Sequence, residues 1–386
     1  MLKNKFLPFA LPDIGEEEIN EVVDTLRSGW LTTGPKTKKF ECDFESFLGD
    51  GVTALAVNSA TAGLHLALEA CGIGPEDEVI TTTFTFTSTA EVVRYLGAHP
   101  VFVDIDPTSL NIDVSLIERA ITPKTKAIIP VHIGGLPCDM DAILKIAKKH
   151  SLKVIEDAAH AFPVKYKDKI IGTLDSDATV YSFYVTKTIT TGEGGMIVTR
   201  DPKIVSRAKT MRLHGIDRDA FDRYTSDKPS WYYEIVSPGY KYNMPDLTAS
   251  IGIHQLKKAY NFKERRTQIA QAYLEGLKCL PIDLPSSSSV DNAWHLFQIR
   301  IKEEAPLSRD NFIKTMAKSG VCCSVHFIPL HMQPYYKNTY GLKEEDYPFA
   351  TKIFSQIVSL PIYTKMTDED VAYVIERIRI LLADVG

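Results

Sequence analysis

The feature that most constrains the fold is an alternation of short apolar runs with helical repeats over roughly the first 200 residues. Apolar residues recur at helical spacing between the runs, as at Leu64, Ala67, Leu68 and Cys71. Strands that are apolar throughout, without polar alternation, are buried on both faces, which is typical of a mostly parallel sheet in an α/β domain. The strands predicted in this way are 54–57, 78–80, 101–103, 127–131, 154–155, 179–183 and 196–198.

The length of 386 residues predicts two domains, because a single core stops growing well below that size. We expect a large domain at 1–248, with a short N-terminal arm, and a smaller α+β domain at 249–386. A polar, aromatic stretch at 217–240 is expected to be a long loop, and a helix at 246–276 should bridge to the small domain. Thr367 and Asp370 have capping-box spacing at the start of a last helix.

Composition excludes several classes of function. A net charge of −5 gives no bulk attraction to nucleic acid or anionic lipid, so an anionic ligand would need a local site. The six cysteines are scattered, and neither a signal peptide nor a membrane-spanning run is visible, so we expect a cytosolic protein with free thiols. Cys322, Cys323, His326 and His331 do not have the spacing of a common zinc site, and no metal is expected.

Polar residues follow three of the predicted strands, where ligands bind in an open parallel sheet. Small residues at 58–62 lead into a helix and could hold an anion, although a plain helix cap is the commoner reason for them. Asp157 follows the strand at 154–155, where a structural salt bridge or a helix cap is an equal alternative. Lys187 precedes a glycine-rich loop and could form a Schiff base, although a lone lysine is more often a surface charge.

These three signals gain weight because they fall on the same edge of one sheet. Together they supply an anion cradle, an acid for a ring nitrogen and an amine for an aldehyde. Those are the three attachments that pyridoxal 5'-phosphate needs.

The chain resembles the DegT-type sugar aminotransferases over nearly its whole length. The motifs that carry the resemblance occur in the family's order, and they lie at 28–35, 58–61, 131–135, 156–160, 182–187, 192–195 and 239–243. The resemblance is closest to the branch that makes 4-amino-4-deoxy-arabinose on a uridine nucleotide. It implies an aspartate-aminotransferase-like fold (fold type I) and a homodimer with active sites at the subunit interface.

The resemblance also implies roles for individual residues. Lys187 would carry pyridoxal phosphate, which becomes pyridoxamine phosphate as an intermediate, and Asp157 would pair with the ring nitrogen. His160 would lie beside the ring, and Phe86 would stack on its face. The phosphate would be bound by Ala60, Thr61 and Ser182, together with Asn243 of the partner subunit.

The reaction implied is amino transfer from glutamate, which leaves as 2-oxoglutarate, to a nucleotide-linked keto-sugar, most simply at C4. The product would serve a surface polysaccharide, a lipopolysaccharide or a natural product. Amination at C3 and a non-catalytic cofactor-binding sensor or regulator are the alternatives. A dehydrating relative would carry histidine where Lys187 stands. For the substrate, Lys241, His326 and His331 are the candidate contacts.

Overall fold

The fold is given by a computed structural model that describes residues 6–217, 231–286 and 290–383. A seven-stranded sheet has the order β1-β9-β8-β5-β4-β2-β3. Only β9 runs against its neighbours β1 and β8, and the other pairings are parallel. The mostly parallel sheet is confirmed, with strands β1 (Thr53–Val57), β2 (Glu78–Thr82), β3 (His99–Val103), β4 (Thr125–Ile129), β5 (Lys153–Asp157), β8 (Ala178–Ser182) and β9 (Gly195–Thr199).

Both faces of this sheet are buried, which explains why its strands are apolar throughout. In β1, Ala54 and Ala56 belong to the core between one face of the sheet and a first set of helices. Leu55 and Val57 belong to the core between the other face and a second set. This division follows from the two-residue period of a strand. The first set is α2 (Pro35–Leu48), α5 (Val114–Ala120), α6 (Met140–His150) and α9 (Asp246–Gly276), and the second is α3 (Ala60–Ala70), α4 (Ser88–Tyr95) and α7 (Pro202–Met211).

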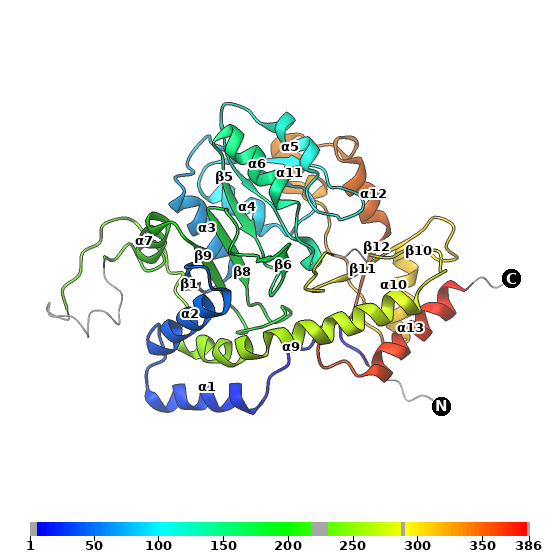
Figure 1. Cartoon of the computed structure of the whole chain (residues 1–386). Coiled ribbons are helices and arrows are strands. Elements are labelled where there is room, and N and C mark those ends of the chain that lie inside the picture. Colours follow the sequence, from blue (N-terminus) through cyan, green and yellow to red (C-terminus); the bar gives the residue numbers. More distant parts are fainter. Residues whose placement is uncertain (1–5, 218–230, 287–289, 384–386) are drawn as a thin grey trace.

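Helix α9 joins the two halves of the molecule (Figure 1). Ala249 and Phe262 belong to the core of the large sheet, whereas Ile269 and Tyr273 belong to a second core. That second core lies against an antiparallel sheet of β10 (Ile282–Asp283), β11 (Phe297–Ile301) and β12 (Ile357–Leu360), with α10 (Arg309–Lys318) and α13 (Asp368–Leu382). A small α+β unit is therefore present, and the boundary at 248/249 stays a prediction.

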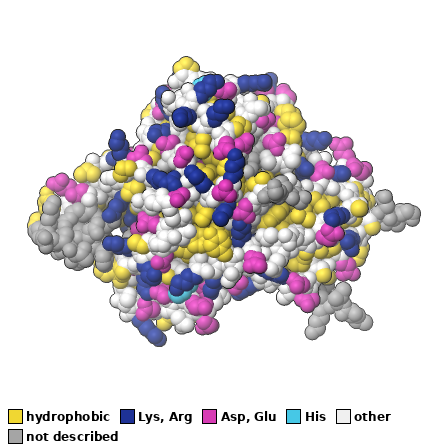
Figure 2. Space-filling view, in the orientation of Figure 1, with side chains coloured by type: hydrophobic (Ala, Val, Ile, Leu, Met, Phe, Trp, Pro, Cys, Tyr) yellow, Lys and Arg dark blue, Asp and Glu magenta, His cyan; other side chains and the backbone are white. Residues whose placement is uncertain are grey.

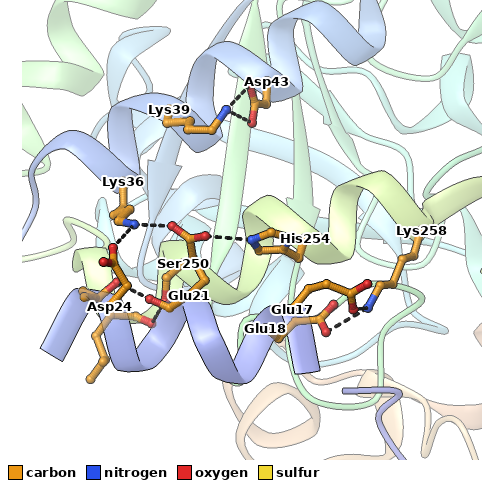
Figure 3. Close-up of polar contacts among 12 residues, drawn as sticks. Glu17, Glu18, Glu21, Asp24, Lys36, Lys39, Asp43, Ser250, His254 and Lys258 are labelled. Atoms are coloured by element: carbon orange, nitrogen blue, oxygen red, sulfur yellow. Dashed lines mark hydrogen bonds and ion pairs between the residues drawn. The ribbon is translucent and has the colours of Figure 1, made fainter. Parts of the chain in front are cut away.

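Helix α1 (Glu16–Ser28) lies along α9 and is held there by ion pairs (Figure 3). Lys258 of α9 reaches Glu17 at 2.9 Å and Glu18 at 2.8 Å, and His254 reaches Glu21 at 2.8 Å. The Glu18 carboxylate is fully buried and also accepts the Gly15 N–H at 2.8 Å. Buried charges need such partners, so these contacts fix the N-terminal segment against the large domain.

Other predictions concern the ends of elements. The capping box of Thr367 and Asp370 at the start of α13 is confirmed. Residues 231–240 contain no helix or extended strand, in agreement with the predicted loop, of which 218–230 lie outside the described residues. Acidic and basic side chains are mixed over the face in Figure 2, and hydrophobic side chains gather near its middle. Among the described helices, none is both long and apolar enough to cross a membrane.

Candidate active site

The segments that follow β1, β5 and β8 converge at one edge of the large sheet. They line a cavity of about 500 Å³, closed on its other side by residues of the small domain. The structure brings eight predicted residues, out of both halves of the chain, to this cavity. They are Ala60, Thr61, Phe86, Asp157, His160, Ser182, Lys187 and His326.

One end of the cavity is formed by the start of α3. Ser59 caps the helix by accepting the Ala62 N–H at 3.1 Å, so the predicted cap is present as well as the predicted cradle. A helix start leaves amide N–H groups directed outward and favours negative charge. A Cβ atom at Gly195 would lie 2.7 Å from the Ala60 nitrogen, so only glycine lets β9 pass this close to the cradle.

Asp157, the last residue of β5, provides the carboxylate of the cavity. One oxygen accepts the Thr89 hydroxyl at 2.8 Å and the other accepts the Ala159 N–H at 3.1 Å. Burial raises the pKa of Asp157, and these two donors, together with Lys187, oppose the rise. No salt bridge engages this carboxylate among the described residues, which leaves it able to pair with a cationic N–H from a ligand.

Lys187 supplies the amine. Burial lowers the pKa of Lys187 to about 8, with Asp157 opposing the shift. At that pKa a useful fraction of the amine is unprotonated near neutral pH, and only the unprotonated amine is a nucleophile. Its Nζ lies 3.5 Å from Nε2 of His295, within hydrogen-bonding distance.

Three histidines surround this amine. His160 accepts the Gly134 N–H at its Nδ1 at 3.3 Å, and its ring centre lies 4.4 Å from that of His295. His326 bonds Ser359 through Nδ1 at 2.9 Å. Burial lowers the pKa of each, to about 4 for His326, so all three are neutral around the lysine.

Three predicted residues lie outside the cavity of this single chain. Asn243 follows an exposed Lys241 along the edge of β1 and donates to the Thr33 hydroxyl at 2.6 Å. His331 is fully buried, and its ring nitrogens bond Thr83 at 2.8 Å and Thr351 at 2.9 Å. With both nitrogens engaged, His331 has no free group to offer a substrate.

Sequence reasoning missed several residues of the site. His295 and Phe327 come from the small domain and line the cavity, and Thr89 of α4 reaches Asp157. Neither spacing nor strand ends mark these positions, because they approach from elements distant in the sequence. A buried pair of His132 and Glu156, 3.0 Å apart, lies behind the site and was likewise missed.

The cavity fits pyridoxal phosphate by the chemistry of its donors. The helix start and Ser182 would hold the phosphate, Asp157 the ring nitrogen, and Lys187 the aldehyde carbon. Phe86, which is 55% exposed and lies 5.8 Å from Phe327, is placed to cover a ring face. Among the described residues there is no group of three histidine, cysteine or acidic side chains that could hold a metal ion.

Comparison with known proteins agrees with this geometry. Residues 12–379 match the model of the DegT/DnrJ/EryC1/StrS aminotransferase family. The chain is 51% identical to the uncharacterised protein MJ1066 of Methanocaldococcus jannaschii, over the full length of both. It is 48% identical to the spore coat polysaccharide biosynthesis protein SpsC of Bacillus subtilis, covering 98% of this chain and 97% of that protein.

A solved structure gives the same result for the fold. The putative sugar aminotransferase Spr1654 of Streptococcus pneumoniae, in a PMP-form, superposes with a TM-score of 0.91 at 36% identity. The match covers 97% of this chain and 98% of that one. A PLP-form of the same protein matches with a TM-score of 0.90.

Proposed function

This chain belongs to the DegT/DnrJ/EryC1/StrS aminotransferase family, and we propose that it aminates C4 of a keto-sugar carried on a uridine or thymidine diphosphate, with glutamate as donor. It is a pyridoxal-phosphate-dependent sugar aminotransferase of fold type I. The observation that carries the proposal is the meeting of Lys187, Asp157 and the α3 start in one cavity.

Bound pyridoxal phosphate supplies an electron sink for a carbanion at the substrate carbon. In our proposal Lys187 would carry the proton: its amine would accept a proton released from the substrate carbon and would give it up again to the bound cofactor. A pKa of about 8 suits a group that must both accept and release a proton near neutral pH.

Asp157 and His160 orient the ring in this proposal. Asp157 would hold the proton on the ring nitrogen, and its fixed carboxylate is already oriented by Thr89. Since Nδ1 of His160 accepts the Gly134 N–H, the proton of the neutral imidazole lies on Nε2. That Nε2–H can then donate to an oxygen on the ring.

For the nucleotide sugar we propose His326, which lines the cavity, and Lys241 at the edge of β1. We do not propose His331 as a substrate contact, because it is buried away from the cavity. Asn243 and Lys241 would reach a site of the partner subunit in a homodimer. We also propose a 4-amino-4-deoxy-arabinose product and a role in lipopolysaccharide or another surface polysaccharide. We propose a cytosolic location as well, which the six free thiols support.

Two other functions use the same fold. A dehydrating relative needs histidine at position 187, and the lysine found there argues against that reaction. A cofactor-binding sensor needs no proton-transfer group, whereas Lys187 is held in the cavity with a lowered pKa. Amination at C3 is separated from amination at C4 only by the position of the product's amine.

The test is turnover with defined substrates. The purified protein, loaded with pyridoxal phosphate, is mixed with glutamate and a uridine or thymidine diphosphate 4-keto-sugar. We expect 2-oxoglutarate and an amino sugar whose nitrogen lies on C4 by NMR. Equal rates with simple keto acids would contradict the sugar-nucleotide assignment, and a loaded protein without turnover would favour the sensor. Nitrogen on C3 would correct the position alone.

A further inference from the structure

His295 is a buried histidine of the small domain that faces the amine of the large domain. Its Nε2 lies 3.5 Å from Nζ of Lys187, although the two residues are 108 positions apart. Only 7% of the residue is exposed. None of the cofactor attachments assigned above uses this side chain.

The backbone around His295 is fixed from both domains. Arg266 of α9 donates to the carbonyl oxygens of Trp294 at 3.2 Å and Ile362 at 2.8 Å. The Ala293 and Leu296 N–H groups donate to the carbonyl oxygens of Gly135 and Gly134, both at 3.1 Å. The loop thus bridges the small domain and the segment that carries the His160 contact, which fixes the backbone from which the imidazole projects.

The ring of His295 is neutral, because burial disfavours its charged form and the groups facing it are cationic or neutral. These groups are Lys187 from the loop after β8, His160 from the loop after β5, Arg266 from α9, and His326 from the segment that follows α10. Together with burial they lower the pKa of His295 well below its ordinary value. A neutral imidazole has one acceptor nitrogen, and a lysine amine or ammonium can donate to it.

The other ring nitrogen of His295, Nδ1, lowers the stability of the fold. Nδ1 is buried and has no hydrogen-bond partner among the described residues. A side chain kept only for packing would avoid that penalty, since an unsatisfied buried polar atom destabilises a fold. An aromatic or aliphatic residue would fill the same space without it.

We propose that His295 is a positioning residue for Lys187, whose Nζ donates a hydrogen bond to Nε2 of the ring and is thereby held toward the cavity. The proposal rests on the assignment of Lys187 as the amine that bears the cofactor. Because the small domain supplies the acceptor, the lysine is correctly placed only when the two domains are packed together.

The hydrogen bond has a measurable consequence for the amine. An acceptor stabilises the ammonium more than the neutral amine, so its loss should lower the pKa of Lys187 relative to that of the wild-type protein. A lost restraint should also lower the rate at which the unprotonated amine attacks, which is the plateau rate at high pH. If His295 only filled space, the pKa of Lys187 and the rate of attack would not depend on whether the substituted side chain reaches far enough to accept a hydrogen bond.

Three substitutions separate these cases. The amide of His295→Gln reaches about as far as Nε2 and can still accept from Lys187. The amide of His295→Asn is one methylene shorter and reaches only the position of Nδ1. His295→Phe keeps a ring without an acceptor. The matched controls are His150→Gln and His150→Asn, at a surface histidine of α6 that pairs with Glu118 at 3.0 Å.

The experiment measures capture of pyridoxal phosphate by the cofactor-free protein as a function of pH. In this reaction the Lys187 amine adds to the aldehyde, water leaves, and the product is followed by its absorbance. We expect the Gln variant and both controls to keep the wild-type acid limb. In the Asn and Phe variants the limb should move about 0.5–1 pH unit lower, and the plateau rate should fall about tenfold or more.

Thermal melts accompany each profile, and if the Phe variant does not fold the Gln and Asn pair decides. Profiles that are the same for Gln and Asn, whether both shifted or both unshifted, would overturn the role of His295. Lys187→Ala is the separate check on the underlying assignment. Normal capture by that variant would show that Lys187 is not the attachment point, whereas a loss of capture with matching Gln and Asn profiles rejects the His295 proposal alone.

Discussion

At the scale of single residues, the chemistry of the cavity depends on Lys187 and Asp157, two ionisable groups that are buried together. Burial lowers the pKa of Lys187 and raises that of Asp157, so both groups move toward neutrality. Each opposes the other's shift, because the charged forms attract. A ligand with an aldehyde and a protonated ring nitrogen would relieve both penalties at once, which is the physical reason that this pair suits pyridoxal phosphate.

We predict that Asp157→Asn slows both half-reactions by about 100-fold or more while the protein still folds. The amide has nearly the same shape, but it cannot hold the proton on the ring nitrogen. Stopped-flow rates with glutamate and with the keto-sugar, measured beside a thermal melt, check this.

The matched control is Asp104→Asn, another buried carboxylate. Asp104 accepts the N–H groups of Phe349 and Ala350, both at 2.9 Å, at the start of α12 (Pro348–Gln356). This variant should lose stability and keep its half-reaction rates. Unchanged rates in Asp157→Asn would show instead that Asp157 is a structural carboxylate.

The sequence was informative for residues that follow strands and uninformative for those that approach from elsewhere. Asp157 and Lys187 could be singled out because the carboxyl ends of parallel strands share an edge. His295 could not, because its place depends on how the small domain packs on the large one. His331 could not be excluded as a substrate contact from the sequence, because it lies only five residues beyond His326. Only the fold shows that its side chain lies in the core.

At the scale of elements, α9 does more than bridge the domains. Its first residue, Asp246, is fully buried and accepts the N–H groups of Gly34 at 2.7 Å, Lys36 at 3.0 Å and Thr37 at 2.9 Å. It therefore caps α2 from a position more than 200 residues away in the chain. The start of α2 and the start of α9 are joined at this one carboxylate.

We predict that Asp246→Ala destabilises the protein by about 2–4 kcal/mol, because it leaves several buried N–H groups without an acceptor. Urea unfolding measures this. The comparison is Asp201→Ala, which removes the ordinary cap of α7, where the side chain accepts the Lys203 N–H of the same helix at 2.8 Å. That loss should be about 1 kcal/mol. Equal losses in the two variants would contradict the linking role of Asp246.

Elements were predictable where the periodicity is local. Every strand predicted in the large sheet is present, and the bounds of the long helix at 246–276 agree with α9. The cap supplied by Asp246 was not predictable, because no local pattern records a contact between α2 and α9. The reversed direction of β9 was also hidden, since burial on both faces is the same for parallel and antiparallel neighbours.

At the scale of the whole molecule, the cavity that contains Lys187 is lined by both domains, and one expected contributor lies outside it. Asn243 lies at the edge of β1, outside the cavity of its own chain, and bonds Thr33. Phe86 and Tyr184 line the cavity yet are 55% and 45% exposed. A second copy of the chain that covers this mouth would explain both observations.

We predict that a mixed dimer of Lys187→Ala and Asn243→Ala subunits regains about one working site per dimer, although each parent dimer is nearly inactive. One site then combines an intact Lys187 with Asn243 of the partner subunit, and the other has both defects. Turnover of the mixture, corrected for the mixed fraction, measures this. Activity no higher than that of the parents, or full activity in a monomer verified by light scattering, would exclude a shared site.

The most direct test of the account is to locate the cofactor on the chain. The protein loaded with pyridoxal phosphate is treated with borohydride, which reduces the C=N bond and makes the attachment permanent, and is then digested and sequenced by mass spectrometry. We predict a single modified residue, Lys187, and no attachment in Lys187→Ala. Attachment at another lysine, or equal labelling of Lys187→Ala, would contradict it.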